Sequence, residues 1–215
     1  MTKAVAGRIV LIAGASSAAG QAAASALTAA GARVVAVGSN ADRLEPVAAE
    51  ARYACDLGDF ASVQRLADTV RAELGPIDGL IHLVGGWRGG GGLIGQTDED
   101  YEFLHTHVVT TLRNTTRAFN ADLLASPAGR LAIVSSVSVD RPTPGGANYA
   151  SVKASAETWT RAVAFGFAKA ESPAAAVIFV VKALEGLEAE LGSSVVGLWE
   201  SDAASVNNTR VRLTA

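Results

Sequence analysis

Short runs of apolar, often β-branched residues recur along the chain and alternate with longer segments in which apolar positions follow a helical period. The apolar runs predict strands at 8–13, 33–37, 51–55, 78–84, 130–135, 174–181 and 209–213. The longer segments predict helices at 21–29, 42–51, 60–74, 101–124, 149–170 and, in shortened form, 185–191. Strands this apolar need helices on both faces. The pattern therefore predicts an α/β fold of the Rossmann type, a doubly wound parallel sheet in a three-layer α/β/α arrangement.

Bulk properties narrow the class of protein. No change of composition divides the 215 residues, so we expect one domain over 1–215. The longest apolar run, 174–181, is too short to span a bilayer, and the N-terminus lacks the long apolar stretch of a secretory signal, so we expect a cytoplasmic protein. The single cysteine, Cys55, is expected to be a small buried residue. The net charge of -3, without a basic cluster, argues against nucleic acid and favours a small-molecule partner.

Seven small residues, 14–20, follow the first predicted strand and lead into the first predicted helix. In a doubly wound sheet, ligands bind beyond the carboxyl ends of the strands. Small residues there let the backbone approach a pyrophosphate, and the helix N-terminus offers free N–H groups and a positive dipole end. We predict a phosphate-binding turn, with an ordinary strand-to-helix turn as the alternative. Its residues are Gly14, Ser16, Ser17, Ala18, Ala19 and Gly20.

The end of the second predicted strand bears on the choice between NAD and NADP. The chain reads Gly38-Ser39-Asn40 there, without the acidic side chain that would hold a ribose 2′-hydroxyl and repel a 2′-phosphate. This favours NADP. Arg43 stands one turn further on, where it either reaches a 2′-phosphate or lies in solvent.

The third and fourth predicted strands also end in residues that suit a ligand. After the third, Asp56 and Leu57 are predicted to cover an adenine ring. The fourth runs into a glycine-rich loop, 85–92, whose backbone has wide conformational freedom. Within it we predict that Trp87 stacks on a flat substrate or on nicotinamide and that Arg88 meets an anionic group; the alternative is a floppy surface connection.

A serine, a tyrosine and a lysine follow the fifth predicted strand. Tyr149 comes thirteen residues after Ser136, and Lys153 comes four residues after Tyr149, on the same face of a helix. An adjacent ammonium favours the phenolate form of a tyrosine, and a strand-end hydroxyl can donate to an oxygen on which charge develops. These three residues are the predicted catalytic group, and Ser136 is also expected to contact substrate.

These features resemble the short-chain dehydrogenase/reductase family over nearly the whole chain. The matching stretches are 14–20, 56–57, 130–136 and 149–153, and the spacing from Ser136 to Tyr149 is the most specific. The resemblance implies hydride transfer between a nicotinamide and a carbonyl, an alcohol, or a C=N or C=C bond. It implies that Tyr149 is the general acid/base, that Ser136 orients the substrate, and that Lys153 binds both Tyr149 and the nicotinamide ribose.

The chain also departs from the family pattern. His82-Leu83-Val84-Gly85 replaces Asn-Asn-Ala-Gly after the fourth strand, and we still expect Val84 and Gly85 to contact the cofactor. Val108 occupies the position of the asparagine that supports a proton relay, with His107 and Thr111 as neighbouring substitutes or as structural residues, like His105. Val181-Lys182 replaces the usual Pro-Gly.

Two functions fit this pattern. We predict an NAD(P)(H)-dependent oxidoreductase without a metal; the alternative is a catalytically weakened NAD(P)-binding regulatory or scaffold protein on the same fold. Segments 85–90 and 173–176 are also similar to the quinonoid dihydropteridine reductase branch, which usually lacks a serine at the position of Ser136. The apolar-rich segment 149–170, with Trp159, Phe165 and Phe167, predicts a homodimer or homotetramer.

Overall fold

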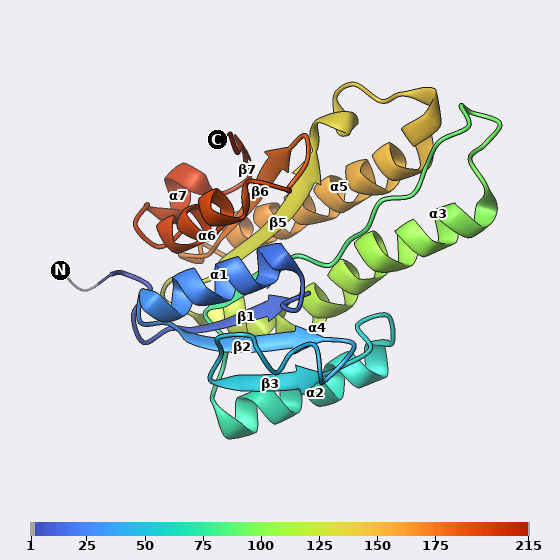
Figure 1. The fold of residues 1–215 in the computed structure, drawn as a ribbon. Helices are drawn as coiled ribbons and strands as arrows, with labels where there is room; N and C mark the ends of the chain where they lie inside the picture. Colours follow the sequence, from blue (N-terminus) through green and yellow to red (C-terminus); the bar gives the residue numbers. More distant parts are fainter. Residues whose placement is uncertain (1–2, 215) are drawn as a thin grey trace.

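The computed structural model describes residues 3–214, which form one sheet of seven parallel strands (Figure 1). The strands are β1 (Ile9–Ala13), β2 (Arg33–Gly38), β3 (Ala51–Ala54), β4 (Gly79–His82), β5 (Arg130–Ser136), β6 (Ala175–Val181) and β7 (Thr209–Arg212). Their order is β3-β2-β1-β4-β5-β6-β7, so the winding reverses between β1 and β4. The predicted doubly wound fold and each predicted strand are thus confirmed.

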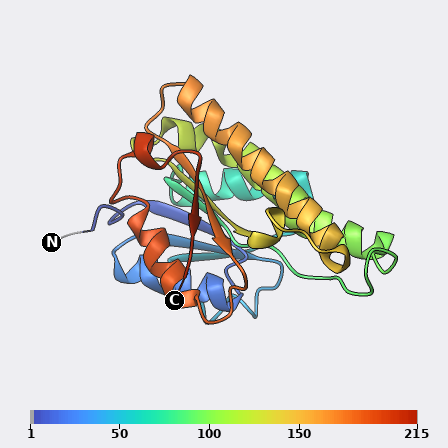
Figure 2. The same cartoon turned by 90° about the horizontal axis from the view of Figure 1, so that it is seen from above.

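Helices cover both faces of the sheet. They are α1 (Ala18–Ala29), α2 (Phe60–Glu73), α3 (Asp98–Leu104), α4 (Thr111–Ala125), α5 (Ala147–Lys169), α6 (Glu188–Gly197) and α7 (Ala203–Val206). A π-helical segment, η1 (His105–Thr110), joins α3 to α4, and short 3-10 turns, η2 (Val137–Val139) and η3 (Pro144–Gly146), follow β5. Figure 2 shows α1 and α6 on one face of the sheet, with α2, α4 and α5 on the other.

The strands serve two cores because their side chains alternate between the faces. Val10 and Ile12 of β1 pack in the core beneath α1 and α6, whereas Leu11 packs with Phe119 of α4 and Phe167 of α5. Burial of each large apolar side chain contributes roughly 1.5–3 kcal/mol. Within residues 3–214, no helix is both long and apolar enough to cross a membrane.

The helix predicted at 42–51 is wrong, because this segment is a series of turns that leads into β3. Leu44 and Val47 are buried in the core as the pattern suggested. Pro46 stands between them, however, and lacks the N–H that a helical hydrogen bond requires. The Glu50 N–H donates instead to the Val34 carbonyl at 2.8 Å and begins the pairing of β3 with β2.

Two other helix predictions are right in place but wrong in detail. The segment predicted as one helix over 101–124 contains the π-helical turn η1, which widens the backbone beside the end of β4. The helix predicted at 185–191 begins at Glu188 and continues to Gly197. Gly192 lets this helix approach α1, since a Cβ there would lie 3.1 Å from the Ala22 carbonyl oxygen. Helix α6 therefore packs on α1.

The loops after β4 and β5 extend beyond the sheet together with α3 and the start of α5 (Figures 1 and 2). They are joined by hydrogen bonds: the Gly90 N–H donates to the Gly145 carbonyl at 2.7 Å. The Gln96 amide donates to the carbonyls of Gly90 and Gly145 at 3.0 and 3.1 Å, and its oxygen accepts from the Asn148 N–H at 3.1 Å. The glycine-rich loop is therefore held in place by polar contacts.

Candidate functional site

A cleft made of two adjoining cavities lies at the carboxyl ends of the strands. The first cavity, of about 270 Å³, lies at the ends of β1, β2 and β3. The second cavity, of about 660 Å³, lies beside β4, β5 and the start of α5. They share Ser17, Leu83, Val84 and Gly85, so the cleft crosses the point where the winding reverses. This is the position at which doubly wound sheets bind ligands.

Two glycines permit the tight turn between β1 and α1. Gly14 has a φ of +85°, and a Cβ there would lie 2.9 Å from backbone atoms of Leu83 and Val84. A Cβ on Gly20 would lie 2.5 Å from the Gly14 carbonyl oxygen. The predicted turn therefore depends on close backbone contacts that a larger residue would disrupt.

The N-terminus of α1 lies where the two cavities meet. Ser16 and Ser17 line the first cavity, and Ser17, Ala18 and Ala19 line the second. The Ser17 hydroxyl caps the helix by accepting from the Gly20 N–H at 3.0 Å. No acidic side chain stands in the first helical turn. The remaining N–H groups and the positive end of the helix dipole thus suit an anion.

The end of β2 forms one edge of the first cavity. Gly38, Ser39 and Arg43 line this edge. Asn40 is not among the lining residues, and its side-chain oxygen accepts from the Arg43 N–H at 3.0 Å. Asn40 therefore shapes the turn that places Arg43.

The opposite edge of the first cavity is the loop after β3, where Asp56, Leu57 and Gly58 line the wall. The Asp56 carboxylate accepts from the Gly58 N–H at 2.8 Å. Asn114, buried on α4, donates to the carbonyls of Leu57 and Gly58 at 3.0 and 2.9 Å. Sequence reasoning missed Asn114, although a polar amide on the buried face of an amphipathic helix signals a side chain with a specific partner.

The first cavity also contains a cysteine side chain. Cys55 lines it and is only partly buried, rather than fully as expected. Burial raises the pKa of its thiol, and the neighbouring Asp56 adds to this effect, so the thiol is protonated at neutral pH. Across residues 3–214, no group of three or more His, Cys, Asp or Glu side chains is placed to hold a metal ion.

Tyr149 and Lys153 both line the second cavity, one turn apart on α5. The Lys153 Nζ atom lies 5.7 Å from the centre of the Tyr149 ring and donates to the Val134 carbonyl of β5 at 2.8 Å. Lys153 is only 7% exposed. This burial lowers the pKa of Lys153 to about 8, and the nearby Glu157 carboxylate acts in the opposite direction. The ammonium is therefore largely charged at neutral pH.

Ser136 lies at the end of β5 and caps the 3-10 turn η2 that follows it. Its hydroxyl donates to the Ser138 hydroxyl and accepts from the Ser138 N–H, both at 3.1 Å. Ser136 is not among the residues that line the second cavity. Burial raises the pKa of Tyr149, and the nearby Ser136 hydroxyl acts in the opposite direction. The lowering expected from the ammonium therefore does not outweigh burial, and the phenol is protonated at neutral pH.

His82, at the end of β4, lines the second cavity and was not predicted as a site residue. The Thr111 hydroxyl donates to the His107 carbonyl at 2.7 Å, so it accepts from His82 Nε2 at 3.1 Å. Burial, together with the charge on Lys153, lowers the pKa of His82 to about 3. His82 is therefore a neutral imidazole whose proton is on Nε2. Its position at a strand end was the signal available in the sequence.

The residues around Val108 divide between the core and the cleft. Val108 is 3% exposed and packs in the core. His107 lines the first cavity, where its Nδ1 bonds to the Phe103 carbonyl at 2.8 Å and its ring stacks on the Phe103 ring. His105 instead stacks on Tyr101, away from both cavities.

The two loop residues predicted to meet substrate lie in different environments. Trp87 lines the second cavity and is 66% exposed. The Arg88 guanidinium lies 3.7 Å from the centre of the Phe103 ring, and its Nη1 lies 3.2 Å from an oxygen of Asp100. Arg88 is already paired. Of these two loop residues, it is therefore Trp87 that is placed to contact a ligand in the second cavity.

The segment 181–188, from the end of β6 to the start of α6, forms the remaining rim of the second cavity. Sequence reasoning did not assign this segment to the site. Its place was marked by the departure from Pro-Gly, but its contacts depend on how α6 packs. The rim residues are Val181, Lys182, Ala183, Leu184, Glu185 and Glu188.

Comparison with known proteins identifies relatives of this sequence. The model of the short chain dehydrogenase family matches residues 8–181. The 2,3-dihydro-2,3-dihydroxybenzoate dehydrogenase of Bacillus subtilis is 31% identical over 176 residues, which cover 78% of this chain and 67% of that protein. The D-threitol dehydrogenase of Mycolicibacterium smegmatis is 44% identical over 87 residues, 37% of this chain and 34% of that protein. The chain thus matches from about a third to two thirds of these relatives.

The fold has solved counterparts of similar length. A metagenomic short-chain oxidoreductase, solved in complex with NADP, superposes with a TM-score of 0.86 and 23% identity. The superposition covers 99% of this chain and 100% of that one. The family match runs from before β1 to the end of β6 and so contains both the turn at 14–20 and the residues at 136, 149 and 153. This chain therefore belongs to the short-chain dehydrogenase family of oxidoreductases.

Proposed function

We propose that this protein uses NADP(H) to move a hydride between the nicotinamide ring and a carbonyl, an alcohol or a conjugated C=N bond of a small molecule. One observation carries the proposal: Tyr149 and Lys153 line a cavity that adjoins the phosphate-binding turn at 14–20. A phenol, a buried ammonium and an anion site then lie along one cleft.

The cleft fits an extended dinucleotide. The turn at 14–20 lies where the two cavities meet: Ser17 lines both, Gly14 and Ser16 line the first, and Ala18 and Ala19 line the second. The pyrophosphate is assigned to the N-terminus of α1, the adenosine to the first cavity and the nicotinamide to the second. The residues proposed to hold it are Gly14, Ser16, Ser17, Ala18, Ala19, Gly38, Ser39, Asp56, Leu57, Val84, Gly85, Tyr149 and Lys153. Gly20 supports the turn through its bond to Ser17, and Asn40 supports the turn beside Ser39.

The first cavity favours NADP over NAD. Ser39 and Arg43 line its β2 edge, where an acidic side chain would repel a 2′-phosphate. A cation at this edge attracts that phosphate. The metagenomic relative in complex with NADP provides a precedent on the same fold.

Tyr149 is the proposed proton donor. The cofactor, when bound, supplies or accepts the hydride. Because burial keeps the Tyr149 phenol protonated at neutral pH, it can donate its proton to a carbonyl oxygen as negative charge develops there. The ammonium of Lys153, anchored on the Val134 carbonyl, stabilises the phenolate that remains. Ser136 is proposed to orient the substrate oxygen from the end of β5, and in the direction of oxidation the substrate returns a proton to Tyr149.

The second cavity suggests a small substrate with a flat or hydroxylated portion. Its volume of about 660 Å³ lies within the range of ligand sites. The exposed ring of Trp87 offers a stacking surface at the wall. Both curated relatives are named as dehydrogenases of hydroxylated compounds, which favours an alcohol or its ketone.

We also propose that the protein is cytoplasmic and forms a homodimer or homotetramer. Phe165 on α5 is 66% exposed, whereas Phe167 is buried, so part of the predicted apolar surface remains uncovered. Sedimentation at micromolar concentration should give at least twice the mass of one chain, and the monomer mass would contradict this assembly.

The test of the function is Tyr149→Phe, assayed with NADPH and NADH against a panel of ketones, diols and quinonoid compounds. Loss of a general acid lowers turnover by about 10²–10⁴-fold, and we expect that loss with nucleotide affinity almost unchanged. Tyr101→Phe, on the exposed surface of α3, is the control and should keep wild-type turnover. Full activity of Tyr149→Phe would refute the assigned role.

The same assay distinguishes a catalytically weakened, nucleotide-binding regulator from an enzyme. Such a protein is favoured by one observation, the buried apolar Val108 at the position of the family's relay asparagine. It would bind nucleotide yet show no turnover with any member of the panel. Failure to bind any of the four nucleotide forms would leave a scaffold role.

A further inference from the structure

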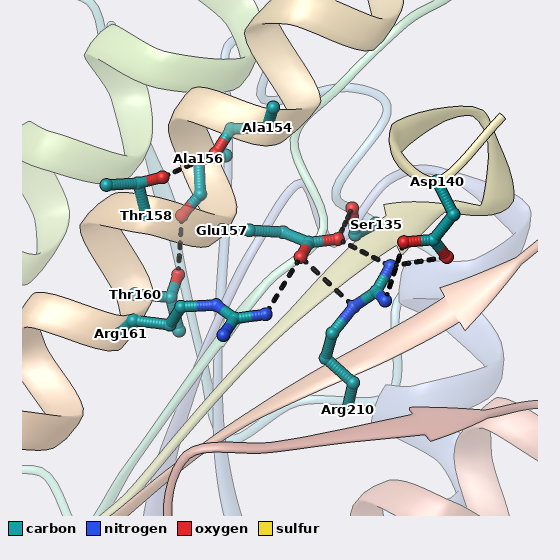
Figure 3. Close-up of polar contacts among 9 residues, drawn as sticks. All are labelled: Ser135, Asp140, Ala154, Ala156, Glu157, Thr158, Thr160, Arg161 and Arg210. Atoms are coloured by element: carbon teal, nitrogen blue, oxygen red, sulfur yellow. Dashed lines mark hydrogen bonds and ion pairs between the residues drawn. The ribbon is translucent and has the colours of Figure 1, made fainter. Parts of the chain in front are cut away.

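A buried carboxylate, that of Glu157, lies one helical turn beyond Lys153 on α5 and takes no part in the proposed chemistry. Figure 3 shows Glu157 and the polar side chains around it. Glu157 is 3% exposed, and its Oε1 accepts from the Ser135 hydroxyl at 2.7 Å. Arg210 places Nη2 3.2 Å from Oε1 and Nε 3.1 Å from Oε2 of the same carboxylate. Arg161 contributes a longer ion pair at 3.6 Å. Glu157 is therefore surrounded by donors from three elements.

The cluster continues from Arg210 towards the turn that follows Ser136. Arg210 lies on the edge strand β7 and binds both carboxylate oxygens of Asp140, at 2.9 and 3.0 Å. Asp140 ends the 3-10 turn that Ser136 begins. Arg210 thus links α5 to the turn after β5, as the dashed contacts in Figure 3 show.

Stability alone does not account for this arrangement. Removing two charges from water is costly, and replacing a buried ion pair with apolar residues of similar volume is often neutral or stabilising. A fully buried glutamate is rare without a partner. The position of Glu157, at the same face of α5 as the site residues, indicates that its charge has another use.

Two consecutive contacts fasten α5 to the end of β5. Tyr149, Lys153 and Glu157 are spaced four residues apart, so they share one helix face. The Lys153 ammonium binds the Val134 carbonyl, and the Glu157 carboxylate binds the hydroxyl of the next residue, Ser135. Ser136 follows directly on the strand. The carboxylate therefore fixes the helix turn that carries Lys153 against the strand that carries Ser136.

We propose that Glu157 is a positioning residue of this site: its buried carboxylate, held by Ser135 and Arg210, keeps the Lys153 ammonium charged and in place beside Tyr149. This inference rests on the proposed function for its catalytic consequence. The effect of Glu157 on the charge of Lys153 does not depend on the proposed function.

The groups around Lys153 determine the direction of the effect. Tyr149 and Glu157 face it from α5, and His82 faces it from β4. Lys182, Glu185 and Glu188 lie further round the rim of the second cavity. Burial lowers the pKa of Lys153 to about 8, and Glu157 acts against this decrease. Removing the Glu157 charge should therefore lower the pKa of Lys153 further, while both arginines remain.

The experiment is competitive acetylation of the nucleotide-free protein with trace acetic anhydride between pH 6 and pH 11, read by mass spectrometry at each of the four lysines. The exposed Lys169 is the internal reference. In the wild type, Lys153 should titrate near pH 8. In Glu157→Gln, which keeps the shape and an acceptor for Ser135, its midpoint should fall by about 1–2 pH units, the size of the Coulomb effect expected between residues one helical turn apart.

Three variants separate this role from a structural one. Asp140→Asn weakens the outer contact of Arg210 but leaves the Glu157 carboxylate, so Lys153 should titrate as in the wild type. Glu50→Gln removes a carboxylate from the exposed pair with Arg33 and should also leave Lys153 unchanged. Glu157→Asp keeps the charge and should restore most of the midpoint. An unchanged Lys153 midpoint in folded Glu157→Gln would overturn the proposal.

A second variant covers the case in which Glu157→Gln does not fold. Glu157→Leu combined with Arg210→Met replaces the ion pair with apolar side chains of similar size, which is often tolerated. It should lower the Lys153 midpoint in the same direction, and a wild-type midpoint in this folded double variant would also overturn the proposal.

The catalytic consequence is read separately in the pH profile of kcat/KM. The limb at high pH should move to lower pH by the same amount in Glu157→Gln. A wild type that lacks turnover dependent on Tyr149 refutes the proposed function but leaves the labelling result intact. A shifted Lys153 midpoint with an unshifted kinetic limb overturns the catalytic part of the inference alone.

Discussion

The two cavities of the cleft are built in different ways. The first is formed largely by backbone and small side chains at strand ends, such as Gly14, Ser16, Gly38 and Gly58. The second contains buried titratable groups, above all His82 and Lys153. The first cavity therefore depends on steric fit, and the second depends on titratable groups held out of water.

This difference predicts two kinds of sensitivity. Substitutions in the first cavity should act through close contacts and local conformation, with little dependence on pH. Changes in the second cavity should act through protonation, because burial shifts the pKa of both His82 and Lys153 downwards. Substitutions in the two cavities can therefore be compared directly.

The largest expected effect is the acid sensitivity conferred by His82. The unfolded chain takes up a proton at His82 below about pH 6.5, whereas the folded protein does so only at about pH 3. The unfolded state binds more protons in this window, so the free energy of unfolding should decrease as pH falls from 6.5 to 3. The loss is about 5 kcal/mol at most, since each pKa unit corresponds to about 1.4 kcal/mol.

Urea unfolding at pH 7 and pH 4 of the wild type, His82→Asn and His105→Asn measures this effect. His82→Asn should lose much less stability on acidification than the wild type, while His105→Asn should behave like the wild type. An equal loss in His82→Asn would show that the buried imidazole does not control acid stability.

The next effect concerns the turn in the first half of the cleft. In Gly14→Ala, the new Cβ would lie 2.9 Å from the backbone of Leu83 and Val84 at a φ of +85°. The backbone conformation alone costs about 1–3 kcal/mol, and the contact would push the turn from the end of β4. We expect NADPH affinity, measured by calorimetry, to fall about 100-fold at both pH 6.5 and pH 8, because about 2.7 kcal/mol corresponds to that factor.

Gly7→Ala is the matched control, because Gly7 has a φ of +76° with open space around its Cβ position. It should lower the melting temperature through the backbone cost but keep wild-type affinity for NADPH. Equal losses of affinity in the two variants would mean that conformational strain, and not close contact at the cleft, governs binding.

The smallest effect is the choice of cofactor at the edge of the first cavity. Ser39→Asp places a carboxylate beside Arg43 at the cavity wall, where it should repel a 2′-phosphate. We expect about a tenfold loss of NADPH affinity, roughly 1.4 kcal/mol, with NADH affinity maintained or improved. Asn40→Asp adds the same charge outside the cavity and keeps the acceptor for the Arg43 N–H, so its effect should be smaller. Equal losses for NADPH and NADH would contradict this role of Ser39.

Local spacing along the chain explains which parts of the candidate site could be predicted from the sequence. The turn at 14–20 and the pair of Tyr149 and Lys153 are encoded by local spacing, so their positions followed from the order of strands and helices. Residues of both line the cleft. The helix wrongly predicted at 42–51 shows the limit of periodicity. Its apolar pattern covers a single turn, and Pro46 within that turn lacks the N–H that a helical hydrogen bond requires.

Residues that act through distant partners could not be found in this way. Asn114 reaches Leu57 and Gly58 from a helix that is far away in the sequence. Glu157 meets Arg210 only because β7 returns to the edge of the sheet beside β6. Likewise, Arg88 was expected to be free for an anion, but the fold of α3 brings Asp100 and Phe103 against it. Such pairings are set by tertiary packing.

The central claim, that one dinucleotide spans both cavities, is tested most directly by a crystal structure with bound NADP⁺. We predict that the pyrophosphate lies over Ser16–Ala19 at the N-terminus of α1 and that the nicotinamide ribose lies within hydrogen-bonding distance of Tyr149 and Lys153. A nucleotide bound outside the cleft, or bound with its nicotinamide end turned away from Tyr149, would contradict the account.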